Sequence, residues 1–279
     1  MSARRDPPPE VLVRFVRTEV YEDAVLASRA REVLGADEGA ALARLRPEAA
    51  RRDYLAAHAL ARTMLAELAG SDPARLRFGC PPRGRPELVA PPAARHLHFS
   101  ISHADGIALC AVAAGCVVGA DVESLRNVGP DPLGVAASVC SRREMDALAM
   151  LPASARAERL LSIWTAKEAV AKATGLGFRL PLPLIAVHEE SNGPPAESGT
   201  GAAEEKTPWR LASFRLTPCH LAAVAVLAAS SAHVALRFEV GALFCPGTAG
   251  PASWSRRGHL ADAVAGKDPT SVPFCTGTS

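Results

Sequence analysis

The chain has 279 residues, and its 31 basic and 29 acidic side chains leave a net charge of +2, which gives no case for general binding of nucleic acid. Seven scattered cysteines without a Cys-x-x-Cys pair favour reduced thiols in the cytoplasm over a disulfide framework or a zinc site. The first residues lack an apolar stretch, and glycine, serine, histidine or proline breaks the uncharged runs 106–120 and 216–236. We therefore expect neither a secretory signal nor a membrane span.

The first predicted element is a helix that includes residues 54–62, and its pattern returns at residues 164–172. In both, an aromatic residue is followed four positions later by His or Glu and eight positions later by Arg or Lys. An apolar strand comes after each helix, at Ile107–Val112 and at Leu221–Leu227. The repeat indicates a duplicated α/β unit whose two halves hold a substrate between them, although short helical repeats also arise by chance in Ala-rich sequence.

Two short polar segments lie between the first helix and the first apolar strand. Residues 83–86 read Arg-Gly-Arg-Pro, a rigid basic turn, and most such turns are solvated loops. Ser102 and His103 end a short extended segment, where they either donate hydrogen bonds to phosphate or are satisfied polar residues of a loop. As a Ser/His nucleophile pair they are weak, because adjacent residues rarely have the geometry for proton abstraction.

Residues 107–123 predict two short buried strands joined by a turn at Ala114-Gly115. Side chains alternate along a strand, so Asp121 and Glu123 at the end of the second strand share a face. Two carboxylates on one face of an apolar strand repel each other and resist burial, and a divalent cation would relieve both problems. The alternative is that the strand emerges into solvent at Asp121 and leaves Glu123 in a polar loop.

A second helix is predicted from Trp164 onward, and a glycine at position 175 ends it. Lys167, Glu168 and Lys172 lie three, four and eight residues after Trp164, so we expect them to share one side of the helix. The carboxylate could hold a metal ion and the lysines could hold phosphate oxygens. The alternative is an exposed helix with an ordinary Glu168–Lys172 ion pair.

The remaining segments are loops and a tail. Residues 189–208 read as a long polar loop, and residues 241–279 are rich in Gly, Pro, Ser and Thr, which is typical of a loose tail. A short apolar element at Val234–Phe238 is expected to pack on the body of the protein.

Four of these elements follow one another in a recognisable order. They are the Gly-Arg-Pro turn, Phe-Ser-Ile-Ser-His, Gly-Ala-Asp-Val-Glu, and the helix that begins Trp-Thr-Ala-Lys-Glu. Over roughly residues 10–230 the chain resembles the 4′-phosphopantetheinyl transferase superfamily, in the longer monomeric form that activates polyketide and nonribosomal peptide synthetases. The expected fold is α+β, with two pseudo-symmetric halves, each a long helix packed on a small antiparallel sheet. The expected domains are 1–115, which contacts coenzyme A, 116–230, which holds the metal and the catalytic helix, and a loose tail, 231–279.

The resemblance implies a reaction and a set of site residues. A magnesium-dependent, cytoplasmic transferase moves phosphopantetheine from coenzyme A onto a serine of an apo carrier protein by in-line transfer and releases 3′,5′-ADP. Glu168, or a water on the metal, takes the proton of the serine, and Lys172 stabilises and protonates the leaving phosphate. The implied metal ligands are Asp121, Glu123 and Glu168. The implied contacts to coenzyme A are Arg52 at the 3′-phosphate, Arg83, Gly84, Arg85, Ser102, His103, Lys167 and Lys172.

The carrier is expected to dock next to the metal. Residues 126–139 leave Glu123 as a Pro/Gly loop and then become apolar, and two arginines follow. Since the resemblance implies an acidic carrier, we place its docking on Leu133, Val135, Arg142 and Arg143, whereas Val139 is expected in the core. Two alternatives to the transferase are a non-catalytic module that binds carrier proteins and a metal-dependent phosphohydrolase.

Overall fold

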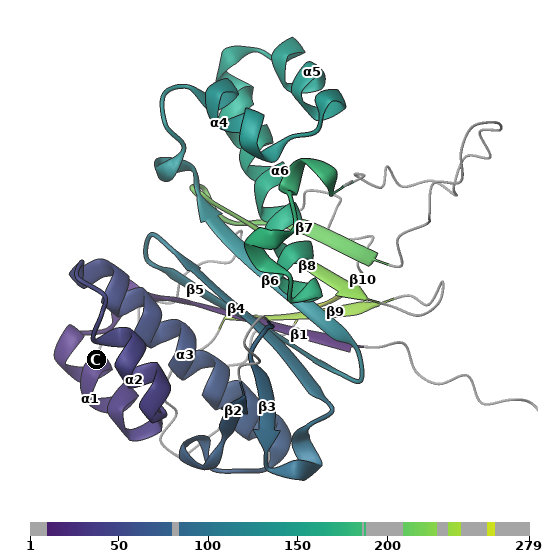
Figure 1. The fold of residues 1–279 in the computed structure, drawn as a ribbon. Coiled ribbons are helices and arrows are strands. Elements are labelled where there is room, and N and C mark those ends of the chain that lie inside the picture. Colours follow the sequence, from purple (N-terminus) through teal and green to yellow (C-terminus); the bar gives the residue numbers. More distant parts are fainter. Residues whose placement is uncertain are drawn as a thin grey trace, which may run out of the picture.

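Two β-sheets lie face to face, and one long helix covers the outer face of each (Figure 1). The computed structural model describes residues 10–79, 84–185, 187, 209–227 and 234–240, and the backbone of residues 256–259. The helices are α1 (Asp23–Val33), α2 (Ala36–Leu42), α3 (Glu48–Ala69), α4 (Pro132–Val139), α5 (Arg142–Met150) and α6 (Ala153–Thr174). The strands are β1 (Glu10–Arg17), β2 (Arg77–Gly79), β3 (Glu87–Ala90), β4 (Leu97–Ala104), β5 (Ile107–Ala114), β6 (Val117–Ser124), β7 (Trp209–Thr217), β8 (His220–Leu227), β9 (Ala235–Val240) and β10 (Arg256–His259).

The first sheet has five strands in the order β10-β9-β1-β5-β4. Neighbouring strands are antiparallel except β1 and β9, which are parallel. Helix α3 covers this sheet, and its Leu60, Met64 and Leu65 form a core with Phe99 of β4 and Val112 of β5. A small separate ribbon of β2 and β3 lies near the end of α3 (Figure 1).

The second sheet is fully antiparallel, in the order β6-β8-β7. Val118 of β6 and Val224 of β8 point inward and meet Val13 and Leu109 of the first sheet. The outer face of β8 packs against α6. The layers therefore run helix, sheet, sheet, helix, which explains why the central strands are apolar on both faces.

This architecture confirms the predicted α+β class with a long helix on a sheet in each half. Helices α3 and α6 each have 22 residues, and each ends at a glycine in the left-handed conformation, Gly70 and Gly175. The two apolar strands that the sequence predicted on either side of Ala114-Gly115 are β5 and β6. They belong to different sheets, so the chain passes from one half to the other at this turn.

Helices α4 and α5 form a small unit at the N-terminal end of α6, beyond the second sheet (Figure 1). Val139, Leu148, Leu160 and Ile163 are buried between the three helices. Ser141 begins α5 with a capping box, in which its hydroxyl accepts from the Glu144 amide and Glu144 accepts from the Ser141 amide.

The prediction of a loose tail from residue 231 is wrong for residues 234–240. Val234 and Leu236 are buried, and β9 pairs with β1 along its whole length. Glu239 accepts from the Arg14 guanidinium of β1 at 2.6 Å. The expected packing of the apolar element at 234–238 is thus confirmed, and the backbone of residues 256–259 adds a further strand. The predicted loop at 189–208 and most of the predicted tail lie outside the described residues.

None of the helices in the described part of the chain combines the length and the apolar character that a membrane crossing requires.

Candidate active site

The predicted carboxylates Asp121 and Glu123 lie on the face of β6 that looks toward α6. The alternate residues of the strand, including Val122, point into the core between the sheets. Helix α6 lies very close to this strand at Gly119, where a Cβ atom would come within 2.6 Å of the Ala173 backbone nitrogen. Only glycine permits this approach, which brings the last turns of α6 over the two carboxylates.

Asp121, Ser102 and Lys172 form one hydrogen-bonded group that joins the two halves. The Lys172 ammonium donates to Asp121 Oδ1 at 2.7 Å and to Ser102 Oγ at 2.9 Å. The Ser102 hydroxyl also donates to Asp121 Oδ1, at 2.8 Å. Asp121 is almost fully buried, and its second oxygen, Oδ2, has no hydrogen-bond partner among the residues that the structure describes. A buried carboxylate oxygen without a partner is costly, so a ligand that supplies positive charge would stabilise this site.

Glu123 and Glu168 add further negative charge beside Asp121. Both side chains are half-buried. Burial, and then the charge of Asp121, raise the pKa of Glu123 to about 7, against a smaller opposite effect of Lys172. The same two causes raise the pKa of Glu168. Three carboxylates therefore share the one ammonium of Lys172, and the group lacks positive charge.

A divalent cation fits this donor set. Among the described residues, no three His, Cys, Asp or Glu side chains converge as a preformed metal site. The orphaned Asp121 Oδ2 and the raised pKa of Glu123 nevertheless mark a place where cationic charge is missing. Carboxylate side chains can rotate to a cation, whereas buried carboxylates without one remain unfavourable. Carboxylate oxygens are also the ligands that Mg²⁺ prefers.

Ser102 and His103 point to opposite sides of β4. Ser102 faces Asp121 and Lys172, whereas the His103 ring lies edge-on to Tyr54 of α3, with 6.5 Å between ring centroids. His103 keeps a solvent-exposed surface. Desolvation by the surrounding atoms lowers the pKa of the His103 imidazole, and Lys172 lowers it further. The two residues thus border the site from different faces and cannot act as a nucleophile pair.

The predicted arginines all come from the first half. Arg52 on α3 forms a two-pronged ion pair with Asp23 of α1, with distances of 2.5 and 2.8 Å. Arg85 donates to the Ala173 carbonyl at the end of α6 and contacts His98 Nδ1 at 3.1 Å. Arg85 therefore bridges the two halves next to the site. Gly84 beside it is exposed, and Arg83 lies outside the described residues.

The prediction that Lys167 shares a side of the helix with Lys172 is wrong. Five residues at 3.6 per turn separate the two directions by about 140° around the helix. Lys167 is completely buried, and its ammonium donates to Glu144 at 2.6 Å and to the Val139 carbonyl at 2.9 Å. Lys167 therefore points into the α4–α5 unit and away from Asp121. Its predicted contact with coenzyme A is wrong.

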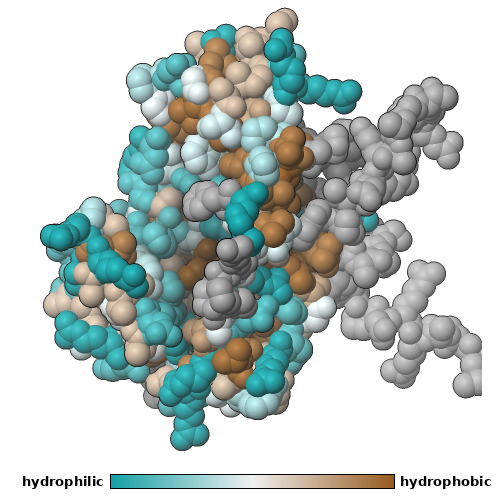
Figure 2. Space-filling view, viewed as in Figure 1, coloured by the Kyte–Doolittle hydropathy of each residue, from teal (hydrophilic) through white to brown (hydrophobic). Residues whose placement is uncertain are grey.

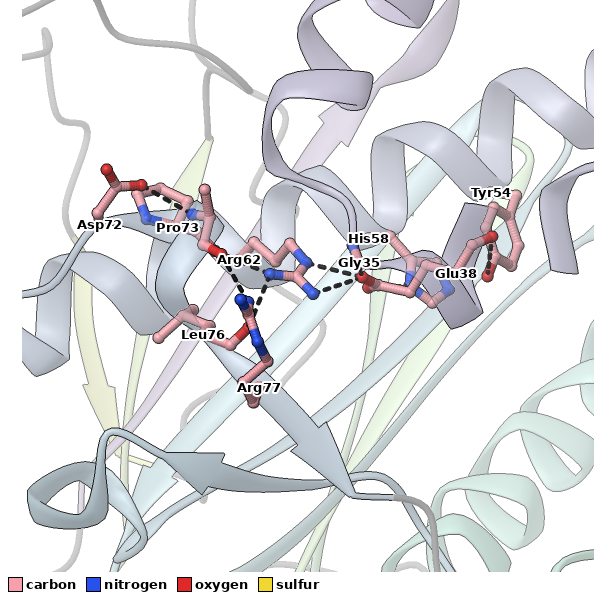
Figure 3. Close-up of polar contacts among 10 residues, drawn as sticks. Gly35, Glu38, Tyr54, His58, Arg62, Asp72, Pro73, Leu76 and Arg77 are labelled. Carbon is pink, nitrogen blue, oxygen red and sulfur yellow. Dashed lines mark hydrogen bonds and ion pairs between the residues drawn. The ribbon is translucent and has the colours of Figure 1, made fainter. Parts of the chain in front are cut away.

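Two polar contacts were not predicted from the sequence, one beside Asp121 and one on α3. Ser100 Oγ accepts a hydrogen bond from the Ala120 amide at 2.9 Å, so this side chain links β4 to β6 where the sheets separate. Glu38 of α2 accepts from Arg62 and contacts His58 Nδ1, both at 2.8 Å (Figure 3). The helical pattern at 54–62 indicated one side of this second group, but no local signal identified Glu38 as its partner.

The residues proposed for docking of a carrier lie on α4 and α5. Leu133 and Val135 are half-buried against the core of this unit, while Arg142 and Arg143 are exposed. Val139 is buried, as predicted. Figure 2 shows apolar surface mixed with polar surface at this end of the molecule, where Met150 is 86% exposed.

Comparisons with known proteins point to one family. A family model described as the 4′-phosphopantetheinyl transferase superfamily matches residues 117–227, which include the acidic group. The L-aminoadipate-semialdehyde dehydrogenase-phosphopantetheinyl transferase of Eremothecium gossypii is 34% identical over 192 residues, which cover 67% of this chain and 68% of that protein.

Two shorter matches agree with this. The 4′-phosphopantetheinyl transferase HetI of Nostoc sp. is 34% identical over 128 residues, and a 4′-phosphopantetheinyl transferase of Bacillus subtilis is 31% identical over 134 residues. These matches cover 46% and 48% of this chain. The chain spans about half the length of these two relatives, 54% and 57%.

Proposed function

Because the chain belongs to the 4′-phosphopantetheinyl transferase superfamily, we propose that it transfers 4′-phosphopantetheine from coenzyme A to a serine of an apo carrier protein. The observation that carries this proposal is the buried carboxylate group around the orphaned Asp121 Oδ2, which lies inside the segment that the family model matches. A group short of positive charge, with one ammonium beside it, suits a metal-bound pyrophosphate.

The proposed metal is magnesium, with Asp121, Glu123 and Glu168 as its ligands. When bound, it would neutralise the charge that develops on the pyrophosphate of coenzyme A. The carrier serine oxygen forms a bond to the phosphorus of the phosphopantetheine phosphate, and the bond from that phosphorus to 3′,5′-ADP breaks. Glu168, or a water molecule on the metal, accepts the serine proton. Lys172 stabilises the leaving phosphate and donates a proton to it.

The proposed coenzyme A contacts come from the first half, residues 1–115, and the metal site from the second, residues 116–230. Arg52 is assigned to the 3′-phosphate, and Arg85 to the remaining phosphates, because a guanidinium binds phosphate through two hydrogen bonds. Ser102 and His103 border the pyrophosphate from the edge of β4. Arg83, which lies outside the described residues, and Gly84 are proposed as further contacts of the phosphates. Lys167 is left out of this set because its ammonium is buried in another contact.

The proposed second substrate is an acyl or peptidyl carrier protein that docks on Leu133, Val135, Arg142 and Arg143. The exposed guanidinium groups and the neighbouring apolar surface would complement an acidic helix beside the modified serine. We further propose that the protein acts as a monomer in the cytoplasm, and that neither nucleic acid nor membrane takes part.

The test is incubation with coenzyme A and MgCl₂, with and without an apo acyl carrier protein, followed by mass spectrometry of the carrier and chromatography of the nucleotide. A transferase adds phosphopantetheine to the carrier and releases 3′,5′-ADP only when carrier is present. Consumption of coenzyme A without carrier would instead indicate a phosphohydrolase, and no reaction with retained carrier binding would indicate a binding module. Asp121→Asn is the matched control, because it keeps the size of the side chain and removes its charge.

A further inference from the structure

Lys167 is the least exposed charged side chain among the described residues, and nothing in the proposed reaction uses it. Its exposed fraction is 0%, and its ion pair with Glu144 has an N–O distance of 2.6 Å. A buried ammonium is retained only where its partners are well placed, because desolvation otherwise outweighs the attraction. The position of these partners therefore indicates what Lys167 does.

Both partners lie at the junction of α4 and α5. Val139 is the last residue of α4, and its carbonyl belongs to the helix end that lacks intrahelical donors and carries partial negative charge. Glu144 lies in the first turn of α5, whose free amides carry partial positive charge, and it also accepts from the Ser141 amide at 2.6 Å. One ammonium thus stabilises the end of one helix directly and the start of the next through a carboxylate.

The two helices that meet there depend on such contacts. Helix α4 has 8 residues and α5 has 9, and helices of this length are not stable alone in water. The capping box at Ser141 orders the start of α5 but does not connect it to the rest of the protein. Lys167 belongs to α6 and adds a buried polar connection to the apolar contacts that the three helices share.

The connection runs directly to the acidic group. Glu168, which borders Asp121, follows Lys167 in the same turn of α6, and Gly119 holds this helix tightly on β6. A contact made by Lys167 therefore sets where the α4–α5 unit lies relative to the carboxylates. The exposed Arg142 and Arg143 of α5 are carried by the same unit.

We propose that Lys167 is a positioning residue for the macromolecular acceptor: it fixes the α4–α5 unit relative to the acidic group and makes no contact with coenzyme A. This inference rests on the proposed function. It gives the two lysines of the helix separate roles, since Lys172 serves the phosphates and Lys167 serves the surface that the acceptor must approach.

The test compares Lys167→Met with the double variant Lys167→Met/Glu144→Gln. The single change leaves Glu144 as a buried charge without its partner and should lower the melting temperature. The double variant contains no unpaired charge, and the side-chain oxygen introduced by Glu144→Gln can still accept from the Ser141 amide, so its melting temperature should largely recover. In both variants the KM for an apo acyl carrier protein should rise by about tenfold, equivalent to about 1.4 kcal/mol, while the KM for coenzyme A stays unchanged.

Hydrogen exchange of residues 132–150, measured without substrates, should be faster in the double variant than in the wild type, with residues 153–174 unchanged. A carrier KM that recovers together with the melting temperature would show a merely structural role and would overturn the proposal. A raised KM for coenzyme A would also overturn it, because Lys167 would then act on the phosphates. If Lys167→Met does not fold, the double variant alone decides the question. Failure of the wild type to modify any carrier would instead contradict the proposed function, and the exchange rates would still test whether Lys167 holds the helices.

Discussion

The two long helices carry similar side chains in opposite electrostatic surroundings. On α3, His58 and Arg62 converge on Glu38, which also accepts from the Gly35 amide (Figure 3). Burial acts to raise the pKa of Glu38, but the hydrogen bonds from His58 and Arg62 outweigh it and lower this pKa to about 2. The acid on this side of the molecule is therefore stabilised in its charged form.

On α6, the corresponding positions hold Glu168 and Lys172, and the balance is reversed. Burial and neighbouring carboxylates raise the pKa of Glu123 to about 7, and Asp121 Oδ2 has no hydrogen-bond partner in the described part of the chain. The first ion group is thus complete among the described residues, whereas the second leaves a buried carboxylate oxygen without a partner there. Perturbed carboxylates that lack a partner are typical of functional sites, whereas a satisfied group is typical of structural ones.

The largest expected effect is loss of turnover when the incomplete group loses a ligand. Asp121→Ala or Glu168→Ala should reduce carrier modification at least about a hundredfold at saturating Mg²⁺, since even residues that only support metal ligands cost up to that factor. The melting temperature of Glu168→Ala without metal should not fall, because this change removes repulsion between carboxylates. Asp121→Ala also removes the acceptor of the hydrogen bonds from Lys172 and Ser102, so its turnover must be compared at a temperature where the variant is folded. Asp37→Ala, an exposed acid on α2, is the matched control. Near-normal turnover of Asp121→Ala would contradict the assignment of this residue.

The second prediction uses the pH dependence of stability to test the raised pKa of Glu123 in the same group. Because the folded protein raises the pKa of Glu123 from 4.5 to about 7, its contribution to stability is fully present below about pH 4.5 and is lost as the pH rises through 7. Glu123→Gln should therefore stabilise the metal-free protein at pH 8, relative to wild type, by roughly 1–3 kcal/mol, and have little effect near pH 4.5.

Urea unfolding at both pH values in the presence of a chelator measures this difference. Addition of MgCl₂ at pH 8 should stabilise the wild type and leave Glu123→Gln less affected, because the cation binds only the folded state. If the free energy of unfolding changed equally between pH 5 and pH 8 in the wild type and in Glu123→Gln, the pKa of Glu123 would not be raised.

The third prediction tests the group around Glu38, where the shift of the carboxylate pKa has the opposite sign. The pKa of Glu38 is lowered from 4.5 to about 2, so its contribution is present above pH 4.5 and is lost as the pH falls toward 2. Glu38→Gln should lower the free energy of unfolding at pH 7 by about 2 kcal/mol, because hydrogen bonds to a charged group are replaced by weaker ones. Turnover of the folded variant should stay normal and should not respond to extra Mg²⁺. A large loss of turnover without loss of stability would mean that the two groups are not distinct.

Strand alternation was sufficient to place both carboxylates of β6 on one face, because a period of two leaves no other choice. The same kind of argument failed for Lys167. Its spacing from Trp164 and the spacing from Glu168 to Lys172 each fit one side of a helix, but the angle between Lys167 and Lys172 does not. The direction of a buried lysine also depends on its acceptors, and Glu144 lies 23 residues away in sequence.

The other features could not be predicted because they depend on contacts between segments that are distant in the sequence. Arg14 and Glu239 are 225 residues apart in sequence, and the predicted domain boundary at residue 231 assigned the strand that pairs with β1 to a loose tail. The hydrogen bond between Ser100 and the Ala120 amide likewise depends on how the two sheets separate, and a hydrophobic pattern along the sequence does not predict this. Local pattern therefore predicted the elements and the acidic face, whereas the pairing of charges needed the three-dimensional arrangement.

The smallest expected effect concerns Arg52, whose ion pair with Asp23 is partly exposed. Arg52 is proposed to bind the 3′-phosphate of coenzyme A, yet both prongs of its guanidinium already contact Asp23. A phosphate must then share or replace this partner, so the net gain is modest. Arg52→Ala should raise the KM for coenzyme A by about tenfold and leave the KM for dephospho-coenzyme A nearly unchanged.

Asp23→Asn provides the matched control, because it frees the same guanidinium without removing it. This variant should bind coenzyme A at least as tightly as the wild type, measured by titration calorimetry, since the phosphate no longer competes with a carboxylate. Equal losses for coenzyme A and dephospho-coenzyme A in Arg52→Ala would show that Arg52 only joins α3 to α1. In that case the basic side of the site would have to come from Arg85 and its neighbours, and α3 would contribute to the packing of the first half more than to recognition of the nucleotide.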